Sequence, residues 1–553
     1  MTLQLRPWQA DAQLKALEWL VRDRVDRHFL INAAPGAGKT LASCAIADAL
    51  LKLGEIDRVV VIAPRTSVVN QWADDFKFVT GRFMTKVTGR DEDIEGMDLD
   101  VCATWAAVQG LMPQLQAVCR SSKVLLICDE HHHAAVEAAW GQGADGAFEA
   151  AKFVLVLTGT PIRSDGGRSV WLAYDDAGAI DHPDGGSYTL TYGKAVDLNY
   201  CRPVTFHRHS GKFTVDLEGG VAVEVADHKQ PDLPKEFARI PGLQAALDFY
   251  KLARTPQFEA DGKTPKSDGY QATMLEWAIQ KLYDLRERMP NAGGLVIAPS
   301  IDMAQYICDL LEKLDGEKPV LVHSQMPNAD GKIDTFRNTD KRWLVSVAMV
   351  SEGVDIKRLR VLMYLPNATT ELAFRQAIGR VVRTAGPHDD TRAYVVMPAL
   401  QIFEEYARRV EEEMPAGKRK DETPNTKRCP ICGTECQRGD SECVACGHEF
   451  PKAPPRLRPC PDCGTLNPVT ATSCLACGKS LTQSFTLTLN EALRIGAIIR
   501  GMDVEETEVV EGERIAKDVR EAVLRSGDAN LVKVMQALPE ESWGRLKDLL
   551  NKA

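Results

Sequence analysis

The sequence predicts an α/β fold with two doubly wound, parallel-sheet lobes, followed by a small cysteine-rich module and a helical C-terminal segment. Strands of nearly continuous Val, Leu and Ile alternate with helix-length segments, and this alternation occurs twice along the chain. Nine of the fifteen cysteines lie between residues 429 and 477. Residues 483–553 are rich in Leu, Ala, Glu and Arg with helical periodicity. At 553 residues the chain is long enough for about three or four domains.

The composition excludes several classes of protein. Hydrophobic residues make up 44% and charged residues 26% of the chain, which excludes collagen-like, coiled-coil and mostly disordered proteins. The net charge is −10, so any nucleic-acid site must be a local basic patch. The N-terminus lacks the pattern of a signal peptide, and no run approaches the ~18 apolar residues of a membrane span. We therefore expect a cytoplasmic protein without membrane contact.

The first lobe is predicted over residues 1–195. Its first strand, HFLINAA, runs into PGAGKT, and LASCAIADALLKL then shows the apolar spacing of a helix. Further strands are predicted at residues 58–64, 99–105, 123–130 and 152–160. Segments of mixed polarity and helical length separate them, as a parallel sheet covered on both faces requires.

The second lobe is predicted over residues 196–408. Its strands are expected at residues 293–300, 318–324, 342–349, 358–366 and 391–398. Residues near 207–290 fit this alternation less well, because Gly- and Pro-rich stretches surround short strands, and we interpret them as an insertion. Residues 415–428 form a polar linker of the kind that rarely packs.

The string AAPGAGKT, residues 33–40, matches a phosphate-binding loop except that Ala33 replaces the first glycine. Gly36 and Gly38 allow the backbone to turn its N–H groups onto phosphate oxygens at the start of a helix. Lys39 would reach the β- and γ-phosphates, and the Thr40 hydroxyl would bind Mg²⁺. The cofactor-binding residues predicted here are Pro35, Gly36, Ala37, Gly38, Lys39 and Thr40. The alternative is a Gly-rich turn that binds no ligand.

A buried apolar strand ends in two consecutive carboxylates in the string ICDEHHH. Asp129 is predicted to hold Mg²⁺, and Glu130 to orient and deprotonate the attacking water. The alternative is an acidic turn at the end of a strand. The following residues, His131 to His133, are poor candidates for a metal site because consecutive side chains on an extended segment do not converge on one ion.

Three further strings follow in order along the chain. They are LTGTP (157–161), SEGVD (351–355) and RQAIGRVVR (375–383). The last one carries Gln376, Gly379, Arg380 and Arg383. Arg380 and Arg383 are three residues apart, so a helix would present both guanidinium groups on one face. A solvated basic surface is the alternative interpretation.

Together these strings resemble the five motifs of superfamily 2 helicases and translocases, over residues 1–408. The Asp-Glu-His-His string and Gln376 place the resemblance on the DExH side of that superfamily. It implies two RecA-like lobes, the helicase ATP-binding and C-terminal domains, with ATP and Mg²⁺ between them. It also implies recognition of adenine by Gln9 with Arg6 nearby, and ribose or phosphate contacts by Gly353 and Asp355. Its implied catalytic residues are Glu130, Gln376, Arg380 and Arg383.

In that superfamily nucleic acid crosses both lobes and is held mainly through its backbone. The resemblance therefore implies DNA as a partner, single-stranded, branched or duplex. The candidate contacts in this sequence are Arg65, Thr104, Trp105 and Ser300.

Residues 429–482 are predicted to form two zinc ribbons. The strings CPICGTECQRGDSECVACG and CPDCGTLNPVTATSCLACG are offset by 31 residues and identical at nine of nineteen positions. Each has the spacing C-x₂-C-x₁₀-C-x₂-C, which suits tetrahedral zinc, so we expect two Zn²⁺ per chain. The predicted ligands are Cys429, Cys432, Cys443, Cys446, Cys460, Cys463, Cys474 and Cys477. Cys436 is expected to be a spectator.

The cysteine-rich tail makes the chain look like the bacterial RadD-type helicases, although no tail residue can be matched to them individually. Basic flanks, Lys418 to Lys420 with Arg456 and Arg458, suit either contact with the DNA backbone or docking of a partner protein. The helical tail, residues 483–553, is a second candidate for binding a partner protein.

Three functions remain open at this point. The first is an ATP-dependent DNA helicase or translocase acting in repair, recombination or defence. The second is a nucleic-acid-activated ATPase switch or adaptor that recruits partners through its zinc ribbons. The third is an RNA helicase. All three would share the same motifs, so the sequence does not discriminate between them.

Overall fold

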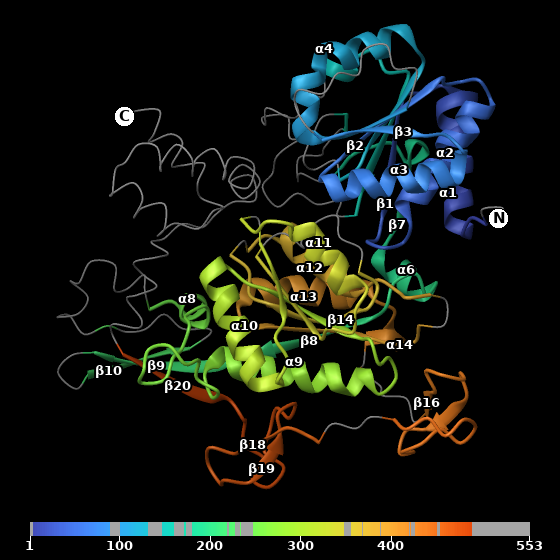
Figure 1. Cartoon of the computed structure of the whole chain (residues 1–553). Helices are drawn as coiled ribbons and strands as arrows, with labels where there is room; N and C mark the ends of the chain where they lie inside the picture. Colours follow the sequence, from blue (N-terminus) through green and yellow to red (C-terminus); the bar gives the residue numbers. More distant parts are fainter. Residues whose placement is uncertain are drawn as a thin grey trace, which may run out of the picture.

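A computed structural model gives the fold of the chain (Figure 1). It describes residues 4–88, 100–130, 146–159, 171–172, 180–217, 221–226, 233, 247–323, 325–347, 356–367, 369–386, 389–419, 421, 426–450 and 454–488. The predicted nucleotide contacts Gly353 and Asp355 lie outside these residues, as do His131 to His133.

The first lobe is a parallel sheet with the strand order β3-β4-β2-β5-β6-β1-β7 among the described residues. Its strands are β1 (His28–Ala33), β2 (Arg58–Ala63), β3 (Met84–Val87), β4 (Asp100–Thr104), β5 (Val124–Cys128), β6 (Phe153–Thr158) and β7 (Ser187–Leu190). Its helices include α1 (Pro7–Leu17), the π-helical turn η1 (Glu18–Asp23), α2 (Lys39–Lys52), α3 (Thr66–Thr80) and α4 (Trp105–Ser121). The central strands β5 and β6 are buried along their whole length because helices cover both faces.

The second lobe is a parallel sheet with the strand order β12-β13-β11-β14-β15-β8. Its strands are β8 (Val204–His209), β11 (Gly293–Ile297), β12 (Val320–Val322), β13 (Trp343–Ser346), β14 (Leu359–Tyr364) and β15 (Ala393–Pro398). Its helices include α8 (Phe249–Ala253), α9 (Tyr270–Arg286), α10 (Ile301–Asp315), α11 (Ala329–Arg337), α12 (Glu371–Val381) and α13 (Gln401–Glu413). The two-lobed α/β fold class expected from the sequence is confirmed.

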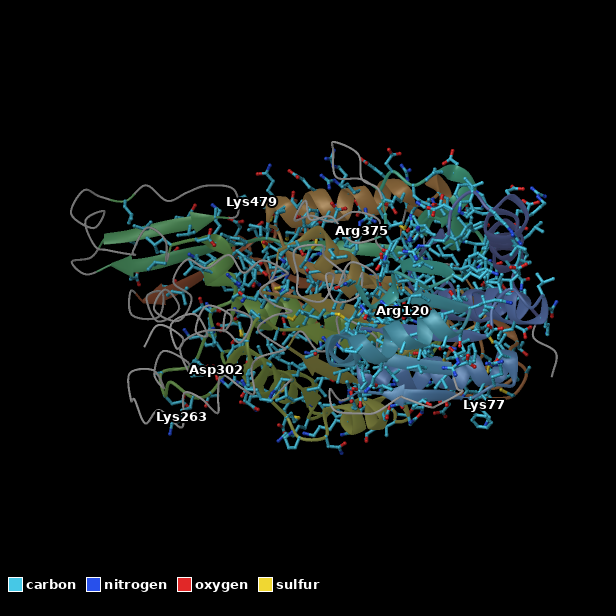
Figure 2. The ribbon with its side chains drawn as sticks, turned by 90° about the horizontal axis from the view of Figure 1, so that it is seen from above. Lys77, Arg120, Lys263, Asp302, Arg375 and Lys479 are labelled. Atoms are coloured by element: carbon cyan, nitrogen blue, oxygen red, sulfur yellow. The ribbon has the colours of Figure 1, made fainter. Side chains whose placement is uncertain are left out.

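A short connection joins the lobes. After the single turn η3 (Asp184–Gly186) and β7, the helix α6 (Tyr192–Asp197) packs against α13 of the second lobe, and the chain then enters β8. Figure 2 shows both lobes from above, with Lys77 on α3 of the first lobe and Asp302 on α10 of the second. Side chains therefore fill the space between sheet and helices in each lobe.

The predicted insertion contains a hairpin of β9 (Gly211–Leu217) and β10 (Val221–Ala226). A strand from beyond the cysteine-rich module, β20 (Gln483–Thr488), joins this hairpin by pairing in parallel with β9. These six residues were expected to begin the helical tail, and that expectation is wrong for them. Phe485 lies 5.7 Å from Phe213, ring centroid to centroid, so tertiary packing selects the strand. Residues 489–553 lie outside the described part of the chain.

Two small hairpins carry the cysteines. They pair β16 (Thr426–Arg428) with β17 (Glu435–Gln437), and β18 (Leu457–Pro459) with β19 (Leu466–Pro468). In Figure 1 both lie on the side of the second lobe opposite the first lobe. The predicted linker contains a one-turn helix, α14 (Ala416–Arg419), and its Asp421 accepts a hydrogen bond from the Tyr394 hydroxyl. Among the described helices, none is both long and apolar enough to cross a membrane.

Candidate nucleotide site and cysteine tetrads

The Gly-rich loop connects β1, which ends at Ala33, to α2, which begins at Lys39. Gly36 and Gly38 have φ angles of +78° and +100°, which side chains other than glycine rarely adopt. Lys39 curls back so that its Nζ donates to the Ala33 carbonyl at 3.0 Å. The N-terminus of α2 therefore faces the second lobe, and the Lys39 ammonium group lies within the Gly-rich loop.

The N-terminal residues Arg6 and Gln9 lie against this loop. The Arg6 guanidinium donates to the Ala37 carbonyl at 2.9 Å, and the Gln9 amide donates to the Gly38 carbonyl at 2.9 Å. Trp8, which is buried between them, also donates to Ala37. The start of α1 and the phosphate-binding loop are thus one packed unit.

Asp129 and Glu130 follow β5 at the edge of the sheet where the Gly-rich loop lies. Glu130 has a φ of +51°, so the chain turns sharply at the end of the strand. The Trp72 indole N–H donates to Asp129 Oδ2 at 2.8 Å and fixes the orientation of the carboxylate. Burial, and then the nearby charge of Glu130, raise the pKa of Asp129 to about 6. A cation bound beside this carboxylate would favour its ionised form.

The second lobe contributes Gln376 and Arg380 from α12, and Arg383 from beyond its end. The sequence predicted one helix face for both arginines. Instead α12 ends at Val381, and Arg383 forms an extended bridge with Cys201. Both arginines nevertheless face the Gly-rich loop, because the chain turns back toward the first lobe after the helix.

A cavity of about 460 Å³ lies between the lobes. The predicted residues on its walls are Arg6, Gln9, Pro35, Gly36, Gly38, Lys39, Thr40, Asp129, Glu130, Gln376, Arg380 and Arg383. Ala37 of the same loop is fully buried and does not line the cavity. Its carbonyl accepts hydrogen bonds from the Arg6 and Trp8 side chains. The fold therefore brings together groups that are more than 370 residues apart in the chain.

The candidate nucleic-acid contacts lie elsewhere. Thr104 is buried and caps α4 by accepting from the Ala107 N–H. Trp105 is 1% exposed, and its indole donates to the Asp129 carbonyl. Ser300 caps α10 by accepting from the Met303 N–H, and Arg65 precedes α3 as its N-cap. These placements give Thr104 and Ser300 capping roles and give Trp105 a packing role in the lobes.

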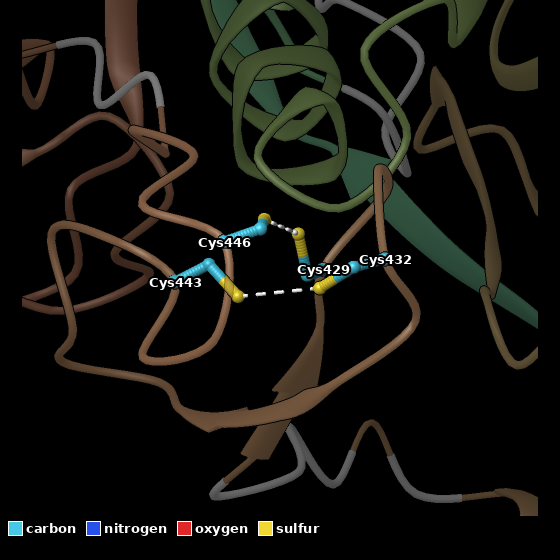
Figure 3. Close-up of side chains that lie close together, drawn as sticks. All are labelled: Cys429, Cys432, Cys443 and Cys446. Atoms are coloured by element: carbon cyan, nitrogen blue, oxygen red, sulfur yellow. Dashed lines mark hydrogen bonds between the residues drawn. The ribbon is translucent and has the colours of Figure 1, made fainter.

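The eight predicted cysteine ligands form two tetrads. Figure 3 shows the first of them, made by Cys429, Cys432, Cys443 and Cys446. In each tetrad all four Sγ atoms lie within 4.8 Å of one another. Cys429 to Cys446 measures 3.6 Å and Cys432 to Cys443 measures 3.5 Å between sulfurs, and the second tetrad has spacings of 3.7 and 3.6 Å. Sulfur atoms around tetrahedral zinc stand about 3.8 Å apart, since each Zn–S bond is about 2.3 Å. Both tetrads therefore suit zinc.

Backbone N–H groups favour thiolates in both tetrads. Those of Cys446 and Ala445 lower the pKa of Cys443 to about 6, and the N–H of Cys477 is the main cause of a pKa of about 6 at Cys474. Cys436 lies on β17 outside the tetrad, and its thiol faces the Thr434 carbonyl at 3.7 Å. The thiolate form of Cys443 and Cys474, one cysteine in each tetrad, is thus available near neutral pH.

Two family models match the chain in the order expected of the two lobes. Residues 2–163 match the res subunit of type III restriction enzymes, and residues 277–385 match the helicase conserved C-terminal domain. The two lobes form a superfamily 2 helicase core. This confirms the resemblance drawn from the motifs, whereas the further likeness to RadD-type helicases stays a prediction.

Relatives of this helicase core include uncharacterized proteins of two mycobacteria. That of Mycobacterium tuberculosis is 32% identical over 393 residues, which are 71% of this chain and 61% of the relative. That of Mycobacterium leprae is 32% identical over 409 residues, 72% of this chain and 63% of the relative. The chain thus spans less than two thirds of the length of the curated relatives it matches.

Solved structures similar to part of this chain include a restriction-modification enzyme and a helicase domain. The ATP-dependent type ISP restriction-modification enzyme LlaBIII bound to DNA has a TM-score of 0.45 and 18% identity, covering 72% of this chain and 28% of that one. The Pyrococcus furiosus Hef helicase domain has a TM-score of 0.42 and 18% identity, covering 73% and 98%.

Three residues near the candidate nucleotide site were not predicted from the sequence. Trp72 binds Asp129, Tyr200 stacks against Arg6, and Cys201 pairs with Arg383. The sequence carries no periodic signal for these contacts, because Trp72 lies on an amphipathic helix and Tyr200 and Cys201 lie in an irregular connection. Only the packing of the two lobes shows them.

Proposed function

We propose that this chain hydrolyses ATP between its two lobes in order to translocate on, unwind or remodel DNA. The observation that carries the proposal is the cavity between the lobes. One wall presents a phosphate-binding loop and two carboxylates, and the other presents two arginines. This is the set of groups that phosphoryl transfer from ATP to water requires.

The first lobe would bind the nucleotide. Backbone N–H groups from Gly36 to Thr40 would receive the phosphates at the N-terminus of α2, and Lys39 would leave the Ala33 carbonyl to reach the β- and γ-phosphates. Thr40 and Asp129 would hold Mg²⁺, which would neutralise charge on the phosphate oxygens. Arg6 and Gln9 would recognise adenine, since both already touch the loop.

Glu130 would orient the attacking water and accept its proton. Its charge is held beside Asp129, and its left-handed backbone turns the side chain into the cavity. Arg380 and Arg383, with Gln376 beside them, would stabilise the charge on the transferring phosphoryl group. An arginine supplied in this way accelerates hydrolysis by ~10³–10⁵, so turnover should require the two lobes to be closed.

DNA is the proposed nucleic acid. The match of residues 2–163 to a restriction-enzyme subunit supports it, because restriction enzymes act on DNA. A role in repair, recombination or defence belongs to the same proposal. With a net charge of −10, the binding surface must be a local basic groove, so DNA affinity should fall steeply as salt rises.

The two cysteine tetrads are proposed to hold one Zn²⁺ each. Each hairpin module is too small to fold on a hydrophobic core alone, so the metal would supply its folding free energy. Of the basic flanking residues, Arg456 binds the Gln280 side chain and the Leu314 carbonyl of the second lobe, and Arg458 donates to the Ala471 carbonyl. Arg456 therefore anchors the second cysteine module to the second lobe, whereas Arg458 makes a contact within that module.

The decisive experiment measures ATP hydrolysis by the full chain with single-stranded DNA, duplex DNA and RNA, beside a strand-displacement assay. We expect stimulation by DNA that depends on Lys39 and Arg383. Stimulation by RNA alone would contradict the DNA assignment. If no nucleic acid stimulated ATP hydrolysis, the proposed helicase or translocase activity would be contradicted.

A switch or adaptor is the second candidate, and one observation favours it. Five of the large hydrophobic side chains exposed in the described structure lie in the cysteine modules: Ile431, Val444, Leu457, Leu466 and Leu475. Such exposure is typical of surfaces that bind another protein. DNA-stimulated hydrolysis without strand displacement or translocation would support this candidate.

A further inference from the structure

The residues Tyr200, Cys201 and Arg202 form the connection between α6 and β8, where the chain passes from the first lobe to the second. They lie behind the segment that carries Arg383. No motif of the sequence includes them, and Tyr200 and Cys201 contact residues of the proposed nucleotide site.

Arg202 anchors this connection to the second lobe. Its backbone N–H donates to the Val382 carbonyl at 2.7 Å, and its guanidinium donates to the Val381 carbonyl at 2.6 Å. The same guanidinium, which is fully buried, pairs with Asp389 at 2.5 Å. The connection therefore cannot move without the end of α12.

Cys201 joins the connection to both catalytic elements. Its backbone forms an antiparallel bridge with Arg383, and its Sγ lies 3.3 Å from the Pro35 carbonyl of the phosphate-binding loop. Burial raises the pKa of the thiol to about 12, so the group stays protonated and can donate to that carbonyl. One residue thus contacts both the loop and Arg383.

Tyr200 extends the same connection to the N-terminus. Its ring lies 4.4 Å from the Arg6 guanidinium, which in turn donates to the Ala37 carbonyl of the loop. Its own carbonyl accepts from the Thr384 hydroxyl at 3.3 Å, one residue beyond Arg383. Arg6 and Arg383 are therefore both in contact with the same short segment, Arg6 through Tyr200 and Arg383 through Cys201.

We propose that Tyr200 and Cys201 are positioning residues that set Arg383 in register with the phosphate-binding loop. The proposal rests on the proposed ATPase function. It names the residues that align the phosphate-binding loop of the first lobe with Arg383 of the second. Alignment matters because a displacement of about 1 Å in a catalytic group can lower a rate by ~10²-fold. Cys201 acts on Arg383 through the backbone bridge and on the loop through its thiol, whereas the Tyr200 ring acts on the loop through Arg6.

The test compares single-turnover ATP hydrolysis by full-length variants, with saturating single-stranded DNA present. We expect Tyr200→Leu to lower the maximal rate about tenfold and to raise the half-saturating ATP concentration about fivefold, since a cation–π contact is worth a few-fold in binding or more. Tyr200→Phe, which keeps the ring, should restore both values. Cys201→Ala should lower the maximal rate and leave the ATP dependence unchanged.

A double-mutant cycle identifies the route of action. In an Arg383→Ala background, Tyr200→Leu should no longer change the maximal rate but should still raise the half-saturating ATP concentration. The matched control is Tyr283→Leu, which removes another half-buried tyrosine beside an arginine, 5.9 Å from Arg342 and away from the cavity. It should leave both kinetic values unchanged.

Each other outcome overturns the inference. The inference would be wrong if Tyr200→Leu had wild-type kinetics, or if Tyr200→Phe lost as much activity as Tyr200→Leu. It would also be wrong if Tyr200→Leu still lowered the maximal rate in the Arg383→Ala background. Equal losses in Tyr283→Leu would show a general loss of stability. If the wild-type chain hydrolyses no ATP, or if Arg383→Ala is fully active, the proposed function fails first and this inference fails with it.

Discussion

Gly36 of the phosphate-binding loop packs directly against the side chain of Arg383 from the other lobe. A β-carbon placed on Gly36 would lie 2.6 Å from Arg383 Cγ, closer than real β-carbons approach their neighbours. A β-carbon placed on Gly379 of α12 would likewise lie only 2.8 Å from Pro35 Cβ. The lobes therefore meet through two glycines, and neither position leaves room for a methyl group.

Gly36→Ala should lower the maximal rate of ATP hydrolysis by tenfold or more, because the new methyl group displaces Arg383 from the loop. Gly54→Ala is the matched control. Gly54 has a similar φ of +68° but nothing within 4 Å of its would-be β-carbon. Both variants should lose ~1–2 kcal/mol of stability from backbone strain, measured by denaturant unfolding. Equal hydrolysis by the two variants would show that the contact between the lobes is irrelevant to catalysis.

Glu130→Gln should retain binding of ATP and lose turnover. The groups that hold phosphate and Mg²⁺ remain, whereas the amide cannot accept a proton from water. Equilibrium binding of a fluorescent ATP analogue and steady-state hydrolysis measure the two effects separately. Turnover at the wild-type rate would remove Glu130 from the catalytic role.

Trp72→Phe should raise the Mg²⁺ concentration needed for half-maximal hydrolysis by about 10-fold or more. The indole N–H fixes Asp129 Oδ2 at 2.8 Å, and loss of such support for a metal ligand typically costs ~10–100-fold in metal affinity. Trp19→Phe is the control, since Trp19 donates to the His28 carbonyl at 2.9 Å, outside the residues lining the cavity. An unchanged Mg²⁺ requirement in Trp72→Phe would contradict the role of the indole.

Asp389→Asn should destabilise the second lobe by ~3–5 kcal/mol, because it leaves Arg202 and Arg360 buried without a counter-charge. Asp390→Asn is the neighbouring control. The Asp390 side chain is 55% exposed and pairs with Arg288 at the surface, so its loss should cost at most about 1 kcal/mol. Unfolding in denaturant at neutral pH measures both.

Asp389 also predicts a dependence of stability on pH. Burial raises its pKa, but attraction to Arg360 and Arg202 outweighs burial and holds the pKa well below the ordinary value of 3.8. A depressed carboxyl pKa stabilises the fold fully above that ordinary value and stabilises it progressively less as the pH falls below about 4. Asp389→Asn should therefore flatten this acid limb of the stability curve, and an unchanged limb would contradict the assignment.

Cys432→Ser should reduce the bound zinc from two ions per chain to one, because a three-thiolate site binds the ion more weakly. Cys436→Ser should keep two ions, since Cys436 lies outside the tetrad on β17. Elemental analysis of purified protein after dialysis against a mild chelator gives both numbers. Two ions retained in Cys432→Ser, or none in the wild type, would be incompatible with the zinc assignment.

The sequence alone predicted the parts whose chemistry demands fixed local spacing. The loop from Ala33 to Thr40 and the pair Asp129 and Glu130 were predicted because each is contiguous and follows an apolar strand. The cysteine tetrads were predicted because two knuckles at a fixed spacing satisfy tetrahedral geometry. The alternation of apolar strands with helices gave both lobes, since buried parallel strands have a distinctive composition.

Only the tertiary structure decided how these parts meet. The pairing of β20 with β9, the bridge between Cys201 and Arg383, and the bond from Trp72 to Asp129 join segments between 57 and 272 residues apart. Such contacts depend on how the sheets stack and how the lobes face each other, and a single indole or thiol leaves no periodic trace in the sequence. Packing also ended α12 at Val381 and so set the position of Arg383 against Gly36.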